Sequence, residues 1–516
     1  MPYRPFNADA MGKHFPLGDS ITGSPHSVTV SLPTAADVIG YEEKDPRVLQ
    51  AMESGYPRFI IHPMIRRWRA EVWRDLGWGE RAGFGLATEQ AVREWTEFVG
   101  EVAKGADVAE VDGAWWVCLP RGAGQDAVRR ARAFLVHTGC GVSSRQAEAA
   151  LVARGLEEPY AEARLEAPAM VADAKVRGYL SVLYGAEVED IYLCRSGMNA
   201  FYAGFRALRA VAAKEGRDLW IQLGWLYVDT TRLLEEYSPR YQQPEKVLRV
   251  DSLDALEALM RERGRRVAGI VTEAPTNPLV QTPDLPWLRA LADQYGAALV
   301  LDPSLASPVN MHLFPYADLH VNSLTKYASP DGDVMIGVLA VNPSSRFYEG
   351  VSALVDRHRC APFWADLQRL AFEIDRFEDT VEQVNANTRE VVAWLEKQPE
   401  VKAVYWAGQA ACVEHFERLG RDGRAPGPGA IISFVLHTPW QDFYDRLAMP
   451  KTPSFGASFS MICPFIYLAH YDLVSDPQGR HELDRAGLAP DLLRLSVGTE
   501  PVEEIIKVLE KALRTR

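Results

Sequence analysis

The sequence lacks an apolar run of about 18 residues, which is the length that a membrane-spanning helix needs. Its first residues, MPYRPFNADAMGKHFPLGD, carry charges and prolines where a secretory signal would need an apolar core. We therefore expect a cytoplasmic protein that does not associate with membranes.

Cysteine is scarce and scattered. No pair of cysteines has Cys-x-x-Cys spacing, so we expect neither a zinc site nor a disulfide framework, and no other metal. Buried free thiols are the ordinary role for such residues. The six are Cys118, Cys140, Cys194, Cys360, Cys412 and Cys463.

Positive charge is also in short supply. The chain has 56 basic and 69 acidic residues, a formal net charge of -13 that is spread along its length. A nucleic-acid-binding or membrane-binding surface would need a basic cluster. We expect a small-molecule ligand instead, in a chain of 516 residues whose 47% hydrophobic content is sufficient for a large core.

Short apolar runs alternate with helical patterns in the middle of the chain. VAGIVTE (267–273), AALVLD (297–302) and ADLHVNS (317–323) read as strands, and LPWLRALADQYG (285–296) reads as a helix. Strands that are apolar throughout indicate a parallel sheet covered on both faces. Ligands collect at the carboxyl ends of such strands, where Glu273, Asp302 and Ser323 fall.

The pattern changes near residue 370. A long helical segment (371–398) is followed by separate strands at 401–405, 430–437 and 492–497 and by a last helix after Pro501. We therefore divide the chain into a large α/β domain over residues 171–370 and a smaller α+β domain over residues 371–516. Residues 66–170 are rich in Trp and Arg and read as mostly helical, and residues 1–65 precede them.

Three local signals near the predicted strand ends each have an ordinary structural explanation. Lys326 could be a solvated strand end, and Asp302 a turn former or helix cap. Ser196 could simply cap a helix whose Phe201 and Phe205 pack inward. Their joint occurrence favours a common chemical role.

Pyridoxal phosphate needs a lysine for covalent attachment, an acid for its pyridine nitrogen, donors for its phosphate and a flat group against its ring. Lys326, Asp302 and Tyr227 can supply the first, second and last of these. The phosphate donors would be the start of a helix and two hydroxyls that flank the lysine, namely Ser196, Gly197, Met198, Ser323 and Thr325.

Six motifs carry a family resemblance. The motifs, in order, are SGMNA (196–200), LYVDT (226–230), EAPTNP (273–278), DPSLASP (302–308), SLTKY (323–327) and LRLSVGTE (493–500). Together they resemble the Cys/Met-metabolism family of pyridoxal-phosphate enzymes. The segments 24–59 and 115–135 further resemble the longer, fungal-type cystathionine γ-synthases.

The resemblance implies fold type I, an α/β architecture with a mostly parallel central sheet, a smaller C-terminal α+β domain and an extended N-terminal region. It implies that Lys326 and Tyr227 are catalytic and that Asp302 contacts the pyridine nitrogen. It adds Ser304 to the cofactor contacts. It places Asn277, Ser454 and Arg494 at the substrate, with Arg494 gripping the substrate carboxylate.

Tyr56 and Arg58 match the family's Tyr-x-Arg, which reaches the cofactor phosphate of a neighbouring subunit. The resemblance therefore implies a homodimer or homotetramer with shared active sites, in which residues 1–65 act as an arm. No partner other than small amino-acid substrates is implied.

The chain departs from the family in several places. A far longer stretch than usual separates Arg58 from Ser196, which indicates an inserted region. Pro330 and Asp331 replace the usual Gly-His after Lys-Tyr. Phe459, in SFGASFS, stands where γ-synthases commonly have a glutamate that orients the incoming amino acid, so we include Phe459 among the substrate-binding residues.

The resemblance implies γ-replacement on an O-acylhomoserine with cysteine to give cystathionine. In this reaction Lys326 moves the Cα proton, a step typically worth ~10²–10⁴ in rate. The alternatives are a C–S lyase, which cleaves cystathionine or methionine by β- or γ-elimination, and a catalytically silent scaffold. Intact Lys326, Asp302 and Arg494 argue against the scaffold.

Overall fold

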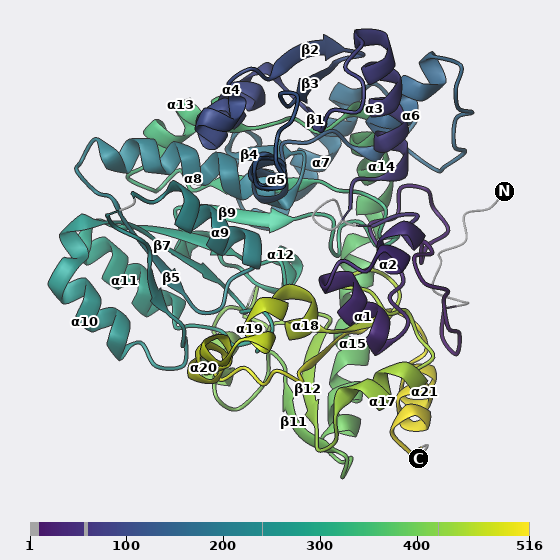
Figure 1. Cartoon of the computed structure of the whole chain (residues 1–516). Helices are drawn as coiled ribbons and strands as arrows, with labels where there is room; N and C mark the ends of the chain where they lie inside the picture. Colours follow the sequence, from purple (N-terminus) through teal and green to yellow (C-terminus); the bar gives the residue numbers. More distant parts are fainter. Residues whose placement is uncertain (1–9, 56–59, 240, 422, 515–516) are drawn as a thin grey trace.

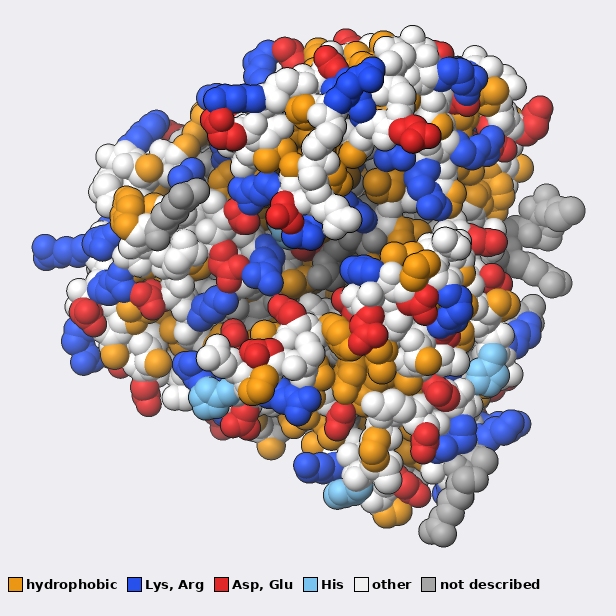
Figure 2. Space-filling view, viewed as in Figure 1, with side chains coloured by type: hydrophobic (Ala, Val, Ile, Leu, Met, Phe, Trp, Pro, Cys, Tyr) orange, Lys and Arg blue, Asp and Glu red, His pale blue; other side chains and the backbone are white. Residues whose placement is uncertain are grey.

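The computed structural model describes residues 10–55, 60–239, 241–421 and 423–514. Among these residues, no helix is both long and apolar enough to cross a membrane. On the face shown in Figure 2, basic and acidic side chains are mixed rather than gathered into one basic patch.

A seven-stranded sheet forms the centre of the large α/β part, with the strand order β4-β10-β9-β8-β7-β5-β6. The pairings from β6 through β5, β7 and β8 to β9 are parallel, and β10 is antiparallel to β9 and β4. The predicted mostly parallel sheet is confirmed. Its strands are β4 (Ile191–Cys194), β5 (Leu219–Leu223), β6 (Glu245–Val247), β7 (Val267–Glu273), β8 (Ala298–Asp302), β9 (Leu319–Ser323) and β10 (Gly337–Val341).

Helices bury both faces of this sheet, which is why its strands are apolar throughout. In β8, Leu299 and Leu301 belong to one hydrophobic core, and Ala298 and Val300 belong to the other. The first core includes side chains of α7 (Ala169–Tyr184), α10 (Asp254–Arg263) and α11 (Leu285–Tyr295). The second includes side chains of α8 (Gly197–Ala213), α9 (Val228–Tyr237) and α13 (Tyr348–His358).

The inserted region, residues 66–170, packs against the second of these layers. Its helices α4 (Glu89–Val99) and α5 (Gln125–Thr138) place Trp95 and Phe134 in the same core as α8. Its helices α3 (Pro63–Leu76) and α6 (Ser144–Ala153) enclose a smaller core with Trp68, Trp73 and Trp116.

The inserted region also contains a three-stranded antiparallel sheet that the sequence analysis did not predict. Its strands are β1 (Gly83–Leu86), β2 (Asp107–Val111) and β3 (Ala114–Cys118), in the order β1-β3-β2. Asp112 and Gly113, with φ of 53° and 71°, form the two-residue turn between β2 and β3. An Asp-Gly pair between apolar runs is a strong hairpin signal, and it was present in the sequence.

The C-terminal part is built on a four-stranded antiparallel sheet with the order β11-β12-β14-β13. Its strands are β11 (Val401–Tyr405), β12 (Ile431–Leu436), β13 (Met461–Pro464) and β14 (Leu493–Ser496), and three of them were predicted. Helix α14 (Trp364–Glu373) leads into the long helix α15 (Phe377–Leu395). The further helices of this part are α16 (Val413–Glu417), α17 (Trp440–Arg446), α18 (Phe465–Ala469), α19 (Tyr471–Ser475), α20 (Pro477–Arg485) and α21 (Val502–Arg514), whereas α12 (Ser307–Asn310) lies between β8 and β9 in the large α/β part.

The N-terminal arm, residues 10–55, lies against the C-terminal part of its own chain (Figure 1). It contains α1 (Ala35–Glu42) and α2 (Pro46–Ala51). Val30, Leu32 and Val38 share one hydrophobic core with Trp440 and Ile505. Burial of these side chains fixes the path of the arm past the carboxyl edge of the central sheet.

Candidate active site

One cavity gathers most of the predicted site residues. It lies at the carboxyl ends of β7, β8 and β9, and the C-terminal part and the arm close it. It is lined by Val28, Gly197, Met198, Phe201, Tyr227, Val228, Thr230, Glu273, Asn277, Asp302, Ser304, Leu305, Ser323, Lys326, Pro453, Ser454, Phe455, Cys463, Phe465, Leu468, Ala469 and Arg494.

Lys326 lies three residues beyond the end of β9 and is buried. Its Nζ donates a hydrogen bond to Ser454 Oγ at 3.2 Å and lies 4.7 Å from the centre of the Phe455 ring. Burial, followed by the positive charge of Arg494, lowers the pKa of Lys326 to about 7. A large fraction of the amine is therefore neutral near pH 7 and able to act as a nucleophile or base.

Two carboxylates stand side by side at the ends of neighbouring strands, because Glu273 of β7 and Asp302 of β8 are paired in register. Asp302 Oδ1 accepts a hydrogen bond from the Ser304 amide at 2.8 Å. Burial raises the pKa of Asp302 to about 6. Burial and the neighbouring Asp302 raise the pKa of Glu273 well above its ordinary value.

Glu273 orients two other residues of the site. Its two carboxylate oxygens accept hydrogen bonds from the backbone amides of Tyr227, at 2.5 Å, and Asn277, at 3.2 Å. Tyr227 precedes α9 and Asn277 belongs to the Pro-Thr-Asn-Pro turn after β7, so one side chain fixes both segments against the strand ends. The sequence analysis placed Glu273 at a strand end but gave it no role.

The start of α8 and the residues after β9 form a polar cradle. Ser196 caps α8, and its Oγ accepts a hydrogen bond from the Asn199 amide at 3.1 Å. The buried hydroxyls of Ser323 and Thr325 have no hydrogen-bond partner among the described residues. A Cβ on Gly197 would lie 2.9 Å from Ser323 Cβ, so glycine is needed for this close approach. A helix N-terminus and two unsatisfied hydroxyls fit a phosphate group.

Arg494 enters from β14, on the C-terminal side of the cavity. Its guanidinium donates hydrogen bonds to Asn277 Oδ1 at 3.2 Å, to the Pro453 carbonyl at 2.8 Å and to the Ser454 carbonyl at 3.1 Å. Arg494 Nε is buried and has no hydrogen-bond partner among the described residues. These contacts hold a permanent positive charge in the cavity, where it can bind a substrate carboxylate.

The cavity brings together Gly197, Met198, Tyr227, Asn277, Asp302, Ser304, Ser323, Lys326, Ser454 and Arg494 from the predicted set. Ser196 and Thr325 lie beside these residues in the chain. Tyr56 and Arg58 lie outside the described residues, so their part in a neighbouring site stays a prediction.

Phe459 requires a correction. It is not among the described residues that line the cavity, and it is fully buried in a separate cluster with Ala10, Ile21, Ala457 and Met461. The Ser458 amide donates to the Pro330 carbonyl and the Ser460 amide donates to Glu500, so the backbone on both sides of Phe459 is fixed. We therefore remove Phe459 from the proposed substrate-binding residues.

The apolar wall of the cavity was missed by the sequence analysis. It is formed by a residue of the arm, by the turn before β13 and by α18, with Val28, Phe455, Phe465, Leu468 and Ala469 as its side chains. These residues come from three distant segments, and none belongs to a polar motif. Their apolar character alone could not distinguish them from core residues.

A family model described as the Cys/Met metabolism PLP-dependent enzymes matches residues 125–514. The chain belongs to this family. The enzyme therefore depends on pyridoxal phosphate, as predicted, and Lys326, Asp302 and the cradle of Ser323 and Thr325 fit that cofactor. Because it is an enzyme of this family, the silent scaffold is no longer a candidate.

Several curated relatives match almost the whole chain, among them the following two. An L-2-amino-4-chloropent-4-enoate dechlorinase/desaturase from Streptantibioticus cattleyicolor is 38% identical over 95% of this chain and 97% of its own length. A cystathionine γ-synthase from Neurospora crassa is 28% identical over 97% of this chain and 98% of its own length. The predicted likeness to fungal cystathionine γ-synthases is confirmed.

Solved structures agree on the fold. A cystathionine γ-lyase from Lactobacillus plantarum superposes with a TM-score of 0.56 at 21% identity, and the match covers 66% of this chain and 85% of that one. This likeness concerns the fold alone. The predicted fold type I architecture is confirmed.

Proposed function

We propose that this enzyme expels a leaving group from Cγ of an α-amino acid. When bound, pyridoxal phosphate supplies an electron-withdrawing ring that stabilises negative charge next to the amino group. Arg494 binds the substrate carboxylate, and Lys326 removes the proton from Cα. The same amine, after giving up that proton, removes a second proton from Cβ, so that the bond to the leaving group at Cγ can break.

The observation that supports this proposal is the distribution of charge over the cavity wall. Among the described lining residues, the acidic side chains are Glu273 and Asp302, and both stand at the strand ends. The lining side chains from the C-terminal part include the apolar Phe455, Phe465 and Leu468. An apolar wall excludes water from the reacting carbons, but it has no carboxylate to hold the ammonium group of a second amino acid.

A second candidate is the replacement of the leaving group by cysteine, which gives cystathionine. Its support is the 28% identity to the Neurospora crassa cystathionine γ-synthase over nearly the full length of both chains. Replacement requires the same first half of the reaction and then a bound thiol. Without Phe459 or an acid in the wall, the incoming amino group would be held weakly.

The relative with 38% identity is named for loss of chlorine from a chlorinated pentenoate amino acid. That name favours elimination over replacement, and a carbon-bound chlorine is an apolar substituent that an apolar wall accommodates well. We therefore extend the proposed substrates from homoserine esters to amino acids that carry a chlorine substituent at C4.

The test compares substrates that differ in the position of the leaving group. Purified holoenzyme is mixed separately with O-acetylserine, O-acetylhomoserine, O-succinylhomoserine and 2-amino-4-chloropent-4-enoate, and the released acid or chloride is measured. We expect release from one or more of the three Cγ substrates and none from the Cβ ester. Release from O-acetylserine alone would contradict the proposal, and Lys326→Ala is the inactive control.

A further inference from the structure

The loop that carries Lys326, residues 324–336, touches two other walls of the cavity. The Gly332 carbonyl accepts a hydrogen bond from the Val28 amide at 2.9 Å, and the Pro330 carbonyl accepts one from the Ser458 amide at 2.8 Å. Val28 lines the cavity, and Ser458 follows the turn that carries Ser454 and Phe455. Backbone hydrogen bonds therefore join this lysine loop to the arm and to that turn.

Helix α14 anchors the lysine loop through buried charges. Arg369 donates hydrogen bonds to Asp331 at 2.6 Å and to the two carboxylate oxygens of Asp333 at 3.2 and 3.1 Å. Glu373 accepts hydrogen bonds from the Ser329 hydroxyl at 3.0 Å and from the Asp331 amide at 3.1 Å. Asp331 is one of the two residues that replace the family's Gly-His, so the departure has a structural use.

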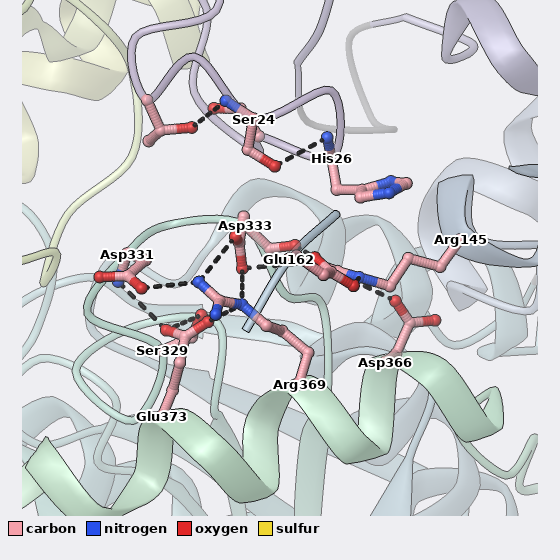
Figure 3. A network of polar contacts seen from close by, with 12 residues as sticks. Ser24, His26, Arg145, Glu162, Ser329, Asp331, Asp333, Asp366, Arg369 and Glu373 are labelled. Atoms are coloured by element: carbon pink, nitrogen blue, oxygen red, sulfur yellow. Dashed lines mark hydrogen bonds and ion pairs between the residues drawn. The ribbon is translucent and has the colours of Figure 1, made fainter. Parts of the chain in front are cut away.

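Arg145 reaches the same loop from the inserted region (Figure 3). It belongs to α6, and its side chain is 1% exposed. Its guanidinium donates to the Asp333 carbonyl at 2.7 Å, to Asp366 of α14 at 3.2 Å and to both carboxylate oxygens of Glu162 at 2.8 and 2.7 Å. One side chain thus joins the inserted region, α14 and the lysine loop.

The two arginines keep the Asp333 carboxylate ionised, whereas burial and the nearby Asp333 and Asp331 raise the pKa of Glu373 well above its ordinary value. Burial by itself would raise the pKa of Asp333, but Arg145 and Arg369 lower it to about 2. Buried charges are expensive unless they are paired with good geometry, so such a network tolerates few alternative positions of its members. The main effect of the network is therefore to fix the position of the lysine loop, and its contribution to the free energy of unfolding is smaller.

We propose that Arg145 is a positioning residue through which the inserted region holds the lysine loop, and with it Lys326 and Val28, in the catalytic geometry. Arg145 touches neither the cavity nor the cofactor cradle, and it acts through Asp333 and Asp366. This role concerns the lysine loop itself, so it holds whether the leaving group is expelled or replaced.

The test combines Arg145→Met with a matched control, Arg154→Met. Arg154 follows α6 and pairs with Asp75 and Asp112, both on the inserted-region side. Hydrogen exchange is measured in the holoenzymes. We expect Arg145→Met to accelerate exchange in residues 324–336 and 26–32, and Arg154→Met to accelerate exchange only near α3 and the β2–β3 turn.

Turnover gives an independent readout. A small misplacement of a catalytic group can lower the rate by about 10²-fold, so Arg145→Met should lower kcat about 10- to 100-fold with a smaller change in KM. Arg145→Lys should restore part of the loss, because it keeps the charge but not the forked contacts. Arg154→Met should keep the wild-type kcat.

If Arg145→Met does not fold, Asp366→Asn and Arg145→Lys decide the matter, since each removes only part of the network. We expect both to accelerate exchange in residues 324–336 and to lower kcat. The proposal is overturned if these variants exchange like wild type in that segment, or if Arg154→Met changes it to the same extent.

Discussion

Lys326 is placed among groups that favour its neutral form. Phe455 covers the amine, Arg494 adds a positive charge nearby, and Ser454 Oγ accepts a hydrogen bond from it. Burial removes hydration from the ammonium, and the opposing charge of Asp302 does not offset this loss, so the pKa falls. The arginine that we propose to bind the substrate carboxylate therefore also prepares the lysine for attack on the cofactor.

The first prediction concerns the rate at which the cofactor-free enzyme attaches pyridoxal phosphate. Only the neutral amine of Lys326 attacks the aldehyde, and the pKa of about 7 means that it predominates above pH 7. The rate constant should therefore rise with pH and reach its half-maximal value near pH 7. Stopped-flow absorbance measures it.

Arg494→Met provides the control for this explanation. Removing the neighbouring positive charge should move the midpoint to higher pH, while burial keeps it below that of a free lysine. A midpoint near pH 10 in the wild-type enzyme would show that the surroundings of Lys326 do not lower its pKa.

The second prediction concerns Lys326→Ala. We expect this variant to fold and to bind pyridoxal phosphate through the cradle of Ser196, Ser323 and Thr325, but without covalent attachment or turnover. Borohydride reduction followed by mass spectrometry measures attachment. A reducible link that persists in the variant would identify another lysine as the attachment point.

At the scale of elements, the start of α8 has to approach the end of β9 closely. Gly197 permits this approach, because a Cβ there would meet Ser323. The two elements together bring the N-terminus of α8 next to the unsatisfied hydroxyl of Ser323. The cradle therefore depends on the packing of two segments that are more than a hundred residues apart.

The third prediction is that Gly197→Ala weakens retention of the cofactor. The added methyl group should displace Ser323 and open the cradle, so dialysis should release pyridoxal phosphate faster than from wild type. Gly178→Ala in α7 is the matched control, since a Cβ there meets nothing within 4 Å. It should gain about 0.4–1 kcal/mol of stability and retain the cofactor. Equal retention in both variants would argue against the proposed cradle.

Elements differed in how well the sequence predicted them. Strands β7, β8 and β9 are buried on both faces, so their apolar runs were clear. The polar residue that ends each run, Glu273, Asp302 or Ser323, was a clear candidate for the site. The β2–β3 hairpin was missed although Asp112 and Gly113 form a typical turn, because Trp and Arg nearby favoured a helical reading. Phe459 was misplaced because motif position does not reveal which side of a turn a residue faces.

At the scale of the whole molecule, the cavity is closed by the arm, the large α/β part and the C-terminal part together. The arm contributes Val28, the central sheet contributes Asp302 and Lys326, and the C-terminal part contributes Phe465 and Arg494. Such long-range assembly cannot be deduced from local patterns. The six motifs located the polar half of the site, whereas only the fold reveals the apolar half.

The fourth prediction is that the active unit contains at least two chains. The family's Tyr-x-Arg, present as Tyr56 and Arg58, should complete the phosphate site of a neighbour. Arg58→Ala should weaken cofactor binding by about 1.5–3 kcal/mol through loss of a charge-assisted contact. Arg66→Ala, at an exposed position, is the control.

Sedimentation at decreasing concentration measures assembly, and full activity of a monomer would refute the arrangement.

The most direct test of the proposed function is the effect of cysteine on leaving-group release. Using whichever Cγ substrate reacts fastest, release is followed with and without cysteine. We predict that the leaving group departs at the same rate in both cases and that a keto acid or unsaturated amino acid accumulates without the thiol. Release that occurs only when cysteine is present, with cystathionine as the sole product, would contradict elimination in favour of replacement.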